Sequence, residues 1–365
     1  MTKVCHITSV HQAKDIRIFH KQCSSLAQAG YDVSLVCANA VSEEVNGVHI
    51  IGVKSKVNSR VARALSTVNQ VYARAVDVDA DIYHLHDPEL LRIAVKLKKR
   101  GKRVIYDVHE DLPRQIMSKH WIPKVLRTTA SSLAEKYEDS ICGQLDAVAC
   151  ATRYIAKRFE PINKNTLTIN NYPLDHEIWS GNETQNKENA VCYIGGVSQI
   201  RGVGHLIDAL SINADVKLNL AGPWSPVTFK SEMQATEGWQ HVNNLGTVSR
   251  EVVGQIMARS IAGLVIFLPE PNHINAQPNK MFEYMSAGLP VIGSDFPLWR
   301  EIIEGNQCGL CIDPTDPQAI ADAIQYITTH PDEALNMGRN GRKAVIEKYN
   351  WNKEAVKLMS MYENI

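Results

Sequence analysis

The chain has 365 residues, 44% of them hydrophobic, and its 39 Lys and Arg balance 39 Asp and Glu. This length suffices for two ordinary domains, and the balanced charge gives no basic field of the kind that binds nucleic acid. No apolar run approaches the roughly 20 residues that a membrane-spanning helix needs, and the first residues indicate a β-strand and not a signal peptide. The eight scattered cysteines fit reduced thiols, so we expect a cytoplasmic protein.

Strand-like and helix-like runs alternate along the first half of the chain. The expected strands span residues 4–10, 32–38, 82–86, 103–109, 147–151 and 166–170. Helical patterns lie between several of them, at 19–29 and 88–99, and Gly30 and Gly101 follow helix ends as C-terminal caps usually do. This alternation predicts a parallel β-sheet with helices on both faces.

The pattern breaks at residues 171–188, where we place the linker between two domains. The alternation then restarts, with strands expected at residues 190–194, 217–221, 241–245, 263–267, 291–294 and 311–313. We therefore predict two doubly wound, Rossmann-like α/β domains, at 1–170 and 189–345, and a final helix within 346–365. Ligands of such sheets bind beyond the carboxyl ends of the strands, so we expect the two domains to face a cleft.

The segment 277–295 predicts a loop, then a helix, then a buried strand. Pro278 suits a helix start, and Gly288 suits the left-handed position after a helix end. A helix start presents free N–H groups and a partial positive charge, which favour a phosphate. Lys280 can contact a diphosphate, and Glu283 can accept hydrogen bonds from ribose hydroxyls. The segment therefore predicts a nucleotide-linked substrate.

The second half opens with a strand that leads into Gly195 and Gly196, then a loop, then Arg201. Glycines let a ligand approach the backbone, and an arginine can pair with a phosphate through two parallel hydrogen bonds. The spacing differs from the glycine fingerprint of dinucleotide-binding folds, which disfavours a nicotinamide-dependent dehydrogenase. A tight strand-to-helix turn would explain these glycines about as well.

Polar side chains follow the strands of the first half where a ligand is expected. They are His11, Asp15, Arg17, His86, Asp87, His109 and Glu110. His109 could hydrogen-bond a reacting hydroxyl or a phosphate, with neighbouring carboxylates orienting it or acting as base. His84 and His86 share one face of their strand and could bind a metal, but with no third ligand evident we favour a polar lining and predict no metal site.

Residues 96–136 hold 11 Lys or Arg but 4 Asp or Glu, with apolar residues such as Met117, Val125 and Leu126 among them. A basic surface with exposed apolar residues suits an anionic membrane. An ordinary solvated helix face is the alternative.

These motifs together resemble the retaining, nucleotide-sugar-dependent glycosyltransferases with the GT-B fold, over essentially the whole chain. The strongest element is Pro278-Asn-Lys-Met-Phe-Glu-Tyr-Met-Ser-Ala-Gly-Leu-Pro-Val-Ile292, supported by Tyr193-Ile-Gly-Gly196. In the first half, His86-Asp-Pro-Glu-Leu-Leu91 and Tyr106-Asp-Val-His-Glu-Asp111 resemble the branch that builds bacterial surface polysaccharides.

The resemblance implies roles for individual residues. Glu283 would bind the donor ribose, and Arg201 would bind the diphosphate with help from Lys280. His109 would lie beside the transferred sugar, and the polar residues of the first half, with His11, Asp15, Arg17, His86, Asp87 and Glu110, would bind the acceptor. The other implied donor-binding residues are Gly195, Gly196, Val248, Asn275 and Asn279. The helix at 346–365 would cross back onto the first domain.

Two positions depart from the common pattern of the family. Asn275 stands where the family often has a glutamate, and Gly196 stands where it often has an arginine. Asn275 can still hydrogen-bond a sugar hydroxyl, but it carries no charge. These departures bear on the identity of the sugar more than on the transfer itself.

The resemblance implies a retaining, metal-independent hexosyltransferase that needs no cofactor. It would move a sugar from a nucleoside diphosphate donor to a hydroxyl of a lipid-linked oligosaccharide during O-antigen or capsule synthesis, at the inner face of the cell membrane. A UDP-sugar is the expected donor, and GDP-mannose is the main competitor. A sugar-nucleotide epimerase of the same architecture and a non-catalytic nucleotide-sugar binding protein are the alternatives.

Overall fold

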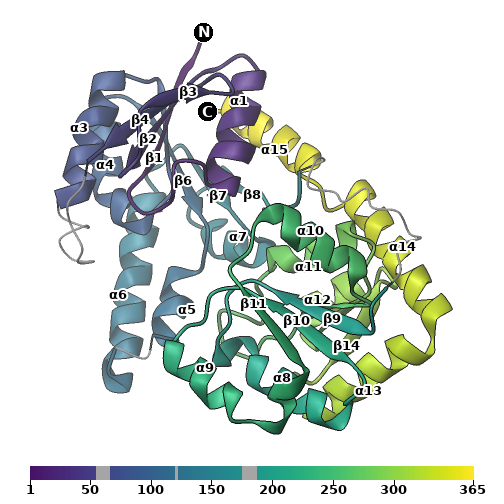
Figure 1. Ribbon diagram of the computed structural model, residues 1–365. Helices are drawn as coiled ribbons and strands as arrows, with labels where there is room; N and C mark the ends of the chain where they lie inside the picture. Colours follow the sequence, from purple (N-terminus) through teal and green to yellow (C-terminus); the bar gives the residue numbers. More distant parts are fainter. Residues whose placement is uncertain (55–65, 120–121, 175–186) are drawn as a thin grey trace. The chain divides into compact units, whose positions relative to one another are not determined.

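The computed structural model describes residues 1–54, 66–119, 122–174 and 187–365 (Figure 1). The chain forms two compact units, the first made of Met1–Asn171 with Trp351–Ile365 and the second of Tyr172–Asn350. The middle of the predicted linker, residues 175–186, lies outside the described residues.

The first unit is built on a sheet with the strand order β3-β4-β2-β1-β5-β6-β7-β8. Every strand pairs in parallel with its neighbours except β3, which is antiparallel to β4. The strands are β1 (Lys3–Thr8), β2 (Asp32–Ala38), β3 (Glu43–Val45), β4 (Val48–Val53), β5 (Ile82–Leu85), β6 (Arg103–Val108), β7 (Ala147–Cys150) and β8 (Thr166–Thr168).

Helices cover both faces of this sheet, as the alternating pattern predicts. Figure 1 shows α3 and α4 on one side and α1 with α15 on the other. A π-helix at Ile16–Cys23 runs into α1. The helices are α1 (Ser24–Gln28), α3 (Val68–Val78), α4 (Leu91–Lys99), α5 (Leu112–Met117), α6 (Lys124–Cys142), α7 (Arg153–Phe159) and α15 (Trp351–Glu363).

The second unit contains a fully parallel sheet with the order β11-β10-β9-β12-β13-β14. Its strands are β9 (Ala190–Ile194), β10 (Lys217–Ala221), β11 (Val242–Gly246), β12 (Gly263–Val265), β13 (Val291–Ser294) and β14 (Gly309–Ile312). Its helices are α8 (Val203–Ile212), α9 (Val227–Gln234), α10 (Arg250–Arg259), α11 (Asn279–Ser286), α12 (Pro297–Ile303), α13 (Pro317–Thr329) and α14 (Pro331–Glu347).

Two apolar cores flank the second sheet, one with side chains from α10, α11 and α12 and the other with side chains from α8, α9 and α13. A close approach at Gly263 fixes α11 against β12. A Cβ atom at Gly263 would lie 2.2 Å from the ring of Tyr284, so no larger residue fits there without moving the helix. The hydroxyl of Tyr284 also accepts from the backbone N–H of Ile194 at 2.8 Å, which connects α11 to β9.

The predicted α/β class and two parallel sheets are confirmed, and most predicted strands lie within two residues of the observed ones. The hairpin β3–β4 is absent from the sequence prediction. Its turn holds Asn46 and Gly47, both with positive φ (54° and 73°), and Asn-Gly is the preferred pair for a tight hairpin turn. The local signal was therefore present, although the short strands around it made it easy to miss.

The last helix begins at Trp351 and packs within the first unit. Trp351 donates through Nε1 to Ser25 Oγ at 2.9 Å, and Glu354 accepts from the backbone N–H of Asn170 at 2.8 Å. Within the described part of the chain, no helix combines the length and the apolar character needed to span a bilayer.

Candidate functional site

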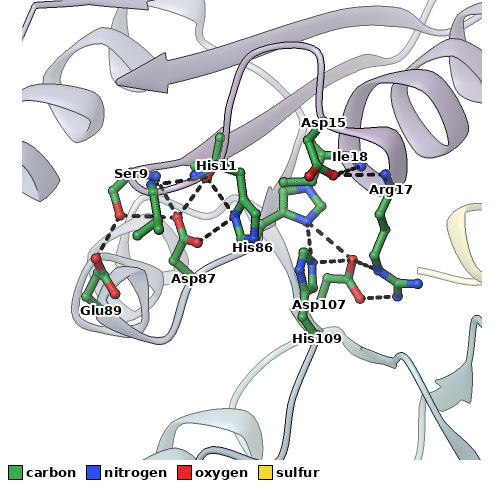
Figure 2. Close-up of polar contacts among 12 residues, drawn as sticks. Ser9, His11, Asp15, Arg17, Ile18, His86, Asp87, Glu89, Asp107 and His109 are labelled. Atoms are coloured by element: carbon green, nitrogen blue, oxygen red, sulfur yellow. Dashed lines mark hydrogen bonds and ion pairs between the residues drawn. The ribbon is translucent and has the colours of Figure 1, made fainter. Parts of the chain in front are cut away.

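The polar residues predicted in the first unit gather beyond the carboxyl ends of β1, β5 and β6 (Figure 2). These three strands are neighbours in the sheet, so the loops that follow them meet at one edge. The loop after β1 supplies His11, and the ends of β5 and β6 supply His86 and His109. The sequence prediction that these loops converge therefore agrees with the geometry of the unit.

Asp107, fully buried at the end of β6, is the centre of this group. Arg17 binds it through two bonds, from Nε to Oδ2 at 2.9 Å and from the second guanidinium nitrogen to Oδ1 at 2.6 Å. Gln22 adds a third bond to Oδ2 at 2.7 Å. Burial alone would raise the pKa of Asp107, but the charge of Arg17 and the hydrogen bonds from His109 and His86 hold that pKa well below its usual range. Asp107 is thus a stable anion that anchors the π-helix.

Two histidines approach the same carboxylate oxygen of Asp107. His109 Nε2 lies 3.0 Å from Oδ2, and His86 Nδ1 lies 3.3 Å from it. His86 is fully buried, which lowers its pKa, whereas the side chain of His109 keeps 18% of its surface exposed. His109 is therefore the member of this group that a ligand can reach.

His11 and Asp87 form a second histidine–carboxylate pair at the same edge, with Nδ1 and Oδ1 3.0 Å apart. Asp87 also accepts from the backbone N–H of Ser9 at 2.6 Å and from Thr8 Oγ1 at 2.9 Å. Burial opposes its ionisation, but the hydrogen bond and charge of His11 and the bonds from Ser9 and Thr8 lower the pKa of Asp87 to about 2. Conversely, burial would lower the pKa of His11, and Asp87 raises it.

Two other predicted residues of this unit have different surroundings. Asp15 caps the π-helix, since its Oδ1 accepts from the backbone N–H groups of Arg17 and Ile18, both at 2.9 Å. Glu110 is exposed and accepts from Gln115. Neither residue hydrogen-bonds to His109 in the described structure, so the geometry favours a structural role for Asp15.

The sequence prediction missed His6 and Tyr362. His6 lies on β1 opposite His84 of β5 in the sheet register, and its Nδ1 is 2.8 Å from His86 Nε2. The Tyr362 hydroxyl, on α15, lies 2.8 Å from His84 Nδ1 and 3.2 Å from His6 Nε2. Strand alternation placed His84 and His86 together, but no local pattern links them to residue 362.

Among the described residues, two sets of ligand atoms lie close enough to hold a metal ion: those of His6, His84 and His86, and those of His86, Asp107 and His109. Most of these nitrogens already lie within hydrogen-bond distance of one another or of Asp107, and His84 Nδ1 lies 2.8 Å from the Tyr362 hydroxyl. Arg17 also neutralises Asp107, and its charge opposes a second cation. This arrangement favours hydrogen bonding over metal coordination.

In the second unit, Lys280 lies in the first turn of α11 with its side chain buried. Its Nζ is 3.5 Å from the centre of the Tyr193 ring and is one of the buried polar atoms without a hydrogen-bond partner in the described structure. Burial, with the nearby charge of Arg201, lowers the pKa of Lys280 well below its usual value. An anion bound beside such a buried amine would provide the ion pair and the hydrogen bond that the amine lacks.

Arg201 and the two glycines stand beside Lys280. The Arg201 guanidinium donates to the carbonyl of Gly196 at 3.2 Å, and a Cβ atom at Gly196 would lie 2.8 Å from that guanidinium. Gly195 has a φ of +117°, and a Cβ atom there would lie 3.3 Å from Lys280 Nζ. Both basic side chains therefore border the half-buried glycine backbone after β9, an arrangement that suits an anion.

Glu283 lies one turn further along α11 and forms an ion pair with Arg250, whose guanidinium nitrogen is 2.9 Å from Oε1. The three other predicted donor residues lie on α11 or in loops of the same unit. Asn279 is the exposed first residue of α11, while Asn275 and Val248 are partly buried in loops. The structure thus brings together Gly195, Gly196, Arg201 and Lys280, and leaves the others at the periphery.

Comparison with known proteins matches a different family to each half of the chain. Residues 17–169 match the model described as Glycosyltransferase Family 4, and residues 176–344 match Glycosyl transferases group 1. The chain belongs to the GT-B glycosyltransferases. The first unit of this glycosyltransferase thus corresponds to the family 4 domain, and the second unit to the group 1 domain.

Individual relatives agree with this assignment. The glycosyltransferase is 25% identical to a phosphatidyl-myo-inositol mannosyltransferase of Mycobacterium leprae over 375 aligned positions, 97% of this chain and 91% of the relative. Its fold is similar to that of a sucrose-phosphate synthase from Thermosynechococcus elongatus (TM-score 0.81, 17% identity, 100% and 98% of the two chains). It is also similar to Anabaena HepE in complex with UDP-glucose (TM-score 0.76, 14% identity, 100% of both chains).

Proposed function

We propose that this glycosyltransferase transfers a hexose from a nucleoside diphosphate sugar to a hydroxyl of a lipid-linked oligosaccharide, with retention of configuration and without a metal. The observation that carries the proposal is the pair of basic side chains, Arg201 and the buried Lys280, beside the glycine backbone after β9. A diphosphate supplies the anion that this pair lacks. Glu283 accepts hydrogen bonds from the ribose hydroxyls, either after Arg250 has moved away or while its carboxylate still pairs with Arg250.

In the proposed reaction, the bond between the sugar C1 and the diphosphate oxygen breaks while a bond from the acceptor oxygen to C1 forms. Negative charge develops on the departing diphosphate, and Arg201 with Lys280 stabilises it in place of a metal ion. The acceptor attacks on the face from which the diphosphate leaves, and its proton passes to a diphosphate oxygen. Asp107 and Asp87 are poor candidates for a covalent nucleophile, since both are buried and each already binds a cationic or hydrogen-bonding partner.

The proposed acceptor side is the first unit, where His109 would contact a hydroxyl of the transferred sugar and His11 and Glu110 would contribute to acceptor binding. The buried His86 and Asp87 would act through the residues they contact, His109 and His11. A UDP-sugar donor is supported by the UDP-glucose complex of the Anabaena protein, whose fold is similar. A lipid acceptor is supported by the name of the Mycobacterium leprae relative, which acts on phosphatidyl-myo-inositol. The surface-polysaccharide role rests on the motifs at residues 86–91 and 106–111.

We further propose that the basic region 96–136 contacts the inner face of the membrane, where a lipid-linked acceptor resides. Helix α6 presents apolar side chains to solvent near its start, with Val125 85% and Leu126 55% exposed. Leu133 and Tyr137 are also exposed, and with Leu126 they form one stripe along the helix. Trp121, part of the same predicted surface, lies outside the described residues.

The decisive experiment incubates the purified protein with a panel of nucleotide sugars, with and without a lipid-linked glycan acceptor. We expect transfer only when the acceptor is present, and Arg201→Ala lowers kcat by about a hundredfold or more, because it removes a group that stabilises the leaving charge. Arg300→Ala is the matched control, since Arg300 is an exposed arginine of the same unit that pairs with Asp295.

Each alternative predicts a different result in this assay. An altered nucleotide sugar formed without acceptor would indicate an epimerase. Donor binding without any turnover would indicate a binding protein. Unchanged transfer by Arg201→Ala would contradict the donor-site assignment.

A further inference from the structure

A continuous series of polar contacts connects the last helix of the chain with His109. His84 Nδ1 is 2.8 Å from the Tyr362 hydroxyl, which is 3.2 Å from His6 Nε2. His6 Nδ1 is in turn 2.8 Å from His86 Nε2. His86 Nδ1 and His109 Nε2 then converge on Oδ2 of Asp107, at 3.3 and 3.0 Å. We call these residues the histidine relay: His6, His84, His86, His109, Asp107 and Tyr362.

The charge of Asp107 sets the direction of every hydrogen bond in the relay. Asp107 is an anion and can only accept, so we assign His86 Nδ1 and His109 Nε2 as its donors. These two nitrogens also lie 3.3 Å apart, but with both protonated they do not hydrogen-bond each other. Burial lowers the pKa of His86 and lowers that of His6 well below its usual value, so each ring is neutral and carries one N–H. Since His86 uses its N–H at Nδ1, its Nε2 must accept from His6 Nδ1.

The same reasoning continues to the end of the relay. His6 donates from Nδ1, so its Nε2 accepts from the Tyr362 hydroxyl. The Tyr362 oxygen then accepts from His84 Nδ1. His84 Nε2 is left as a lone pair, in agreement with its being a buried nitrogen without a hydrogen-bond partner in the described structure. The reverse direction would point a lone pair of His86 at the Asp107 carboxylate, which is unfavourable.

We propose that Tyr362 and His6 are positioning residues that hold His86 and His109 in single tautomers, so that Nδ1 of His109 faces the substrate as a hydrogen-bond acceptor. This inference rests on the proposed role of His109 beside the transferred sugar. His86 and His109 share one oxygen of Asp107, so a change in the proton position on His86 alters the bond that orients His109. An acceptor nitrogen suits a sugar hydroxyl, which can donate to it.

Because the relay is buried, loss of one of its hydrogen bonds is costly, and this holds the histidines in single tautomers. Tyr362 is 3% exposed, and His6 and His84 are fully buried, so no bulk water replaces a lost partner. Removing the Tyr362 hydroxyl leaves His6 Nε2 and His84 Nδ1 without a partner at once, and His6 and His86 can then exchange tautomers. The tautomers at the site therefore depend on Tyr362, which lies 278 positions from His84 and 356 positions from His6 along the chain.

The test compares Tyr362→Phe with Tyr83→Phe. Tyr83 is the matched control, because it is a buried tyrosine of the same unit. Its hydroxyl donates to the carbonyl of Ala75 at 3.0 Å and accepts from the backbone N–H of Ala80 at 3.1 Å, and in the described part of the chain it has no hydrogen bond to the relay. Both variants lose one buried hydroxyl, so both lose similar stability. We expect Tyr362→Phe to lower kcat by about three- to tenfold, the equivalent of one hydrogen bond, with the donor KM unchanged, and Tyr83→Phe to keep the wild-type kcat.

Histidine-selective ¹⁵N NMR provides a readout that a merely structural role does not change. In the wild type we expect His109 as a single tautomer protonated at Nε2, and in Tyr362→Phe a mixture of tautomers at His86 and His109. The spectrum requires no substrate, so it remains informative even if the protein proves not to transfer a sugar. Wild-type ring signals in Tyr362→Phe, or a stoichiometric metal ion in the purified protein, would overturn the proposal, because a metal would replace these ring protons.

Discussion

The protonation of the buried Lys280 amine is expected to be coupled to ligand binding. Its amine is buried against the Tyr193 ring, with Arg201 nearby and Glu283 already paired with Arg250. The unliganded protein therefore favours the neutral amine at a pH where a free lysine is charged. A bound diphosphate reverses this preference, since an adjacent anion stabilises the ammonium.

Donor binding is thus expected to take up a proton at a pH between the lowered pKa of Lys280 and 10.5, its usual value. Calorimetry of UDP binding in two buffers with different ionisation enthalpies, at a pH where UDP is fully ionised, measures this uptake. Lys280→Met should abolish the uptake and weaken binding by about ten- to a hundredfold, the cost of one charged hydrogen bond. Equal enthalpies in both buffers for the wild type would disprove the coupling.

The sequence predicted the contact between Lys280 and a phosphate but not the buried, unpartnered state of the amine. That state depends on Tyr193 and Gly195, which lie more than eighty positions earlier and reach Lys280 only because β9 and β12 are adjacent in the sheet. A pattern of residue types along the chain carries no information about desolvation by distant rings.

At the scale of elements, α6 differs from the other helices of its unit. Only its last turns are buried, at Glu138, Ile141 and Cys142, while its start exposes apolar side chains among lysines and arginines. Charge and composition alone predict this region from the sequence. The structure adds that Val125 and Leu126 face solvent and are available to a bilayer.

If α6 contacts an anionic membrane, Val125→Asp should weaken binding to phosphatidylglycerol-containing vesicles by about tenfold, since it removes one buried valine from the bilayer interface. Cosedimentation with vesicles measures the effect, and added salt should weaken binding of the wild type. Val227→Asp, at an exposed valine of the second unit, is the control. Equal binding of both variants and the wild type would exclude this surface.

The secondary structure itself was largely predictable from local pattern. Strands 32–38, 190–194, 217–221 and 291–294 match β2, β9, β10 and β13 at both ends. Buried parallel strands are short apolar runs, and the alternation of such runs with helical periods is a local property. The first predicted helix differs, since Asp15 caps a π-helix that begins three residues before the expected start.

At the scale of the whole molecule, stability depends on pH through the pair of His11 and Asp87. The pKa of Asp87 is lowered from 3.8 to about 2, so its stabilisation is present above pH 3.8 and is lost as pH falls through 2. The pKa of His11 is raised, so its contribution is present below 6.5 and is lost as pH rises above that value. The pair therefore stabilises the fold most between pH 3.8 and 6.5.

We expect Asp87→Asn to lower the free energy of unfolding by about 2 kcal/mol within this window, and by less on either side of it. Melting temperatures of wild type and variant, measured from pH 3 to pH 8, check the shape of this difference. His11→Gln should remove the decline above pH 6.5. A constant difference across the whole range would show that the pair does not titrate as a unit.

The sequence by itself determined the α/β class, the positions of most strands, the convergence of polar loops in the first unit and the position of helix α11. All of these follow from periodicity and from the edge at which parallel strands bind ligands. The tertiary structure alone decided the bond between Arg17 and Asp107, the burial of Lys280 and the link from Tyr362 to His109. Those features join residues about 80 to 356 positions apart along the chain. Their interaction energies depend on the exclusion of water from the protein interior, and that interior exists only after the chain has folded.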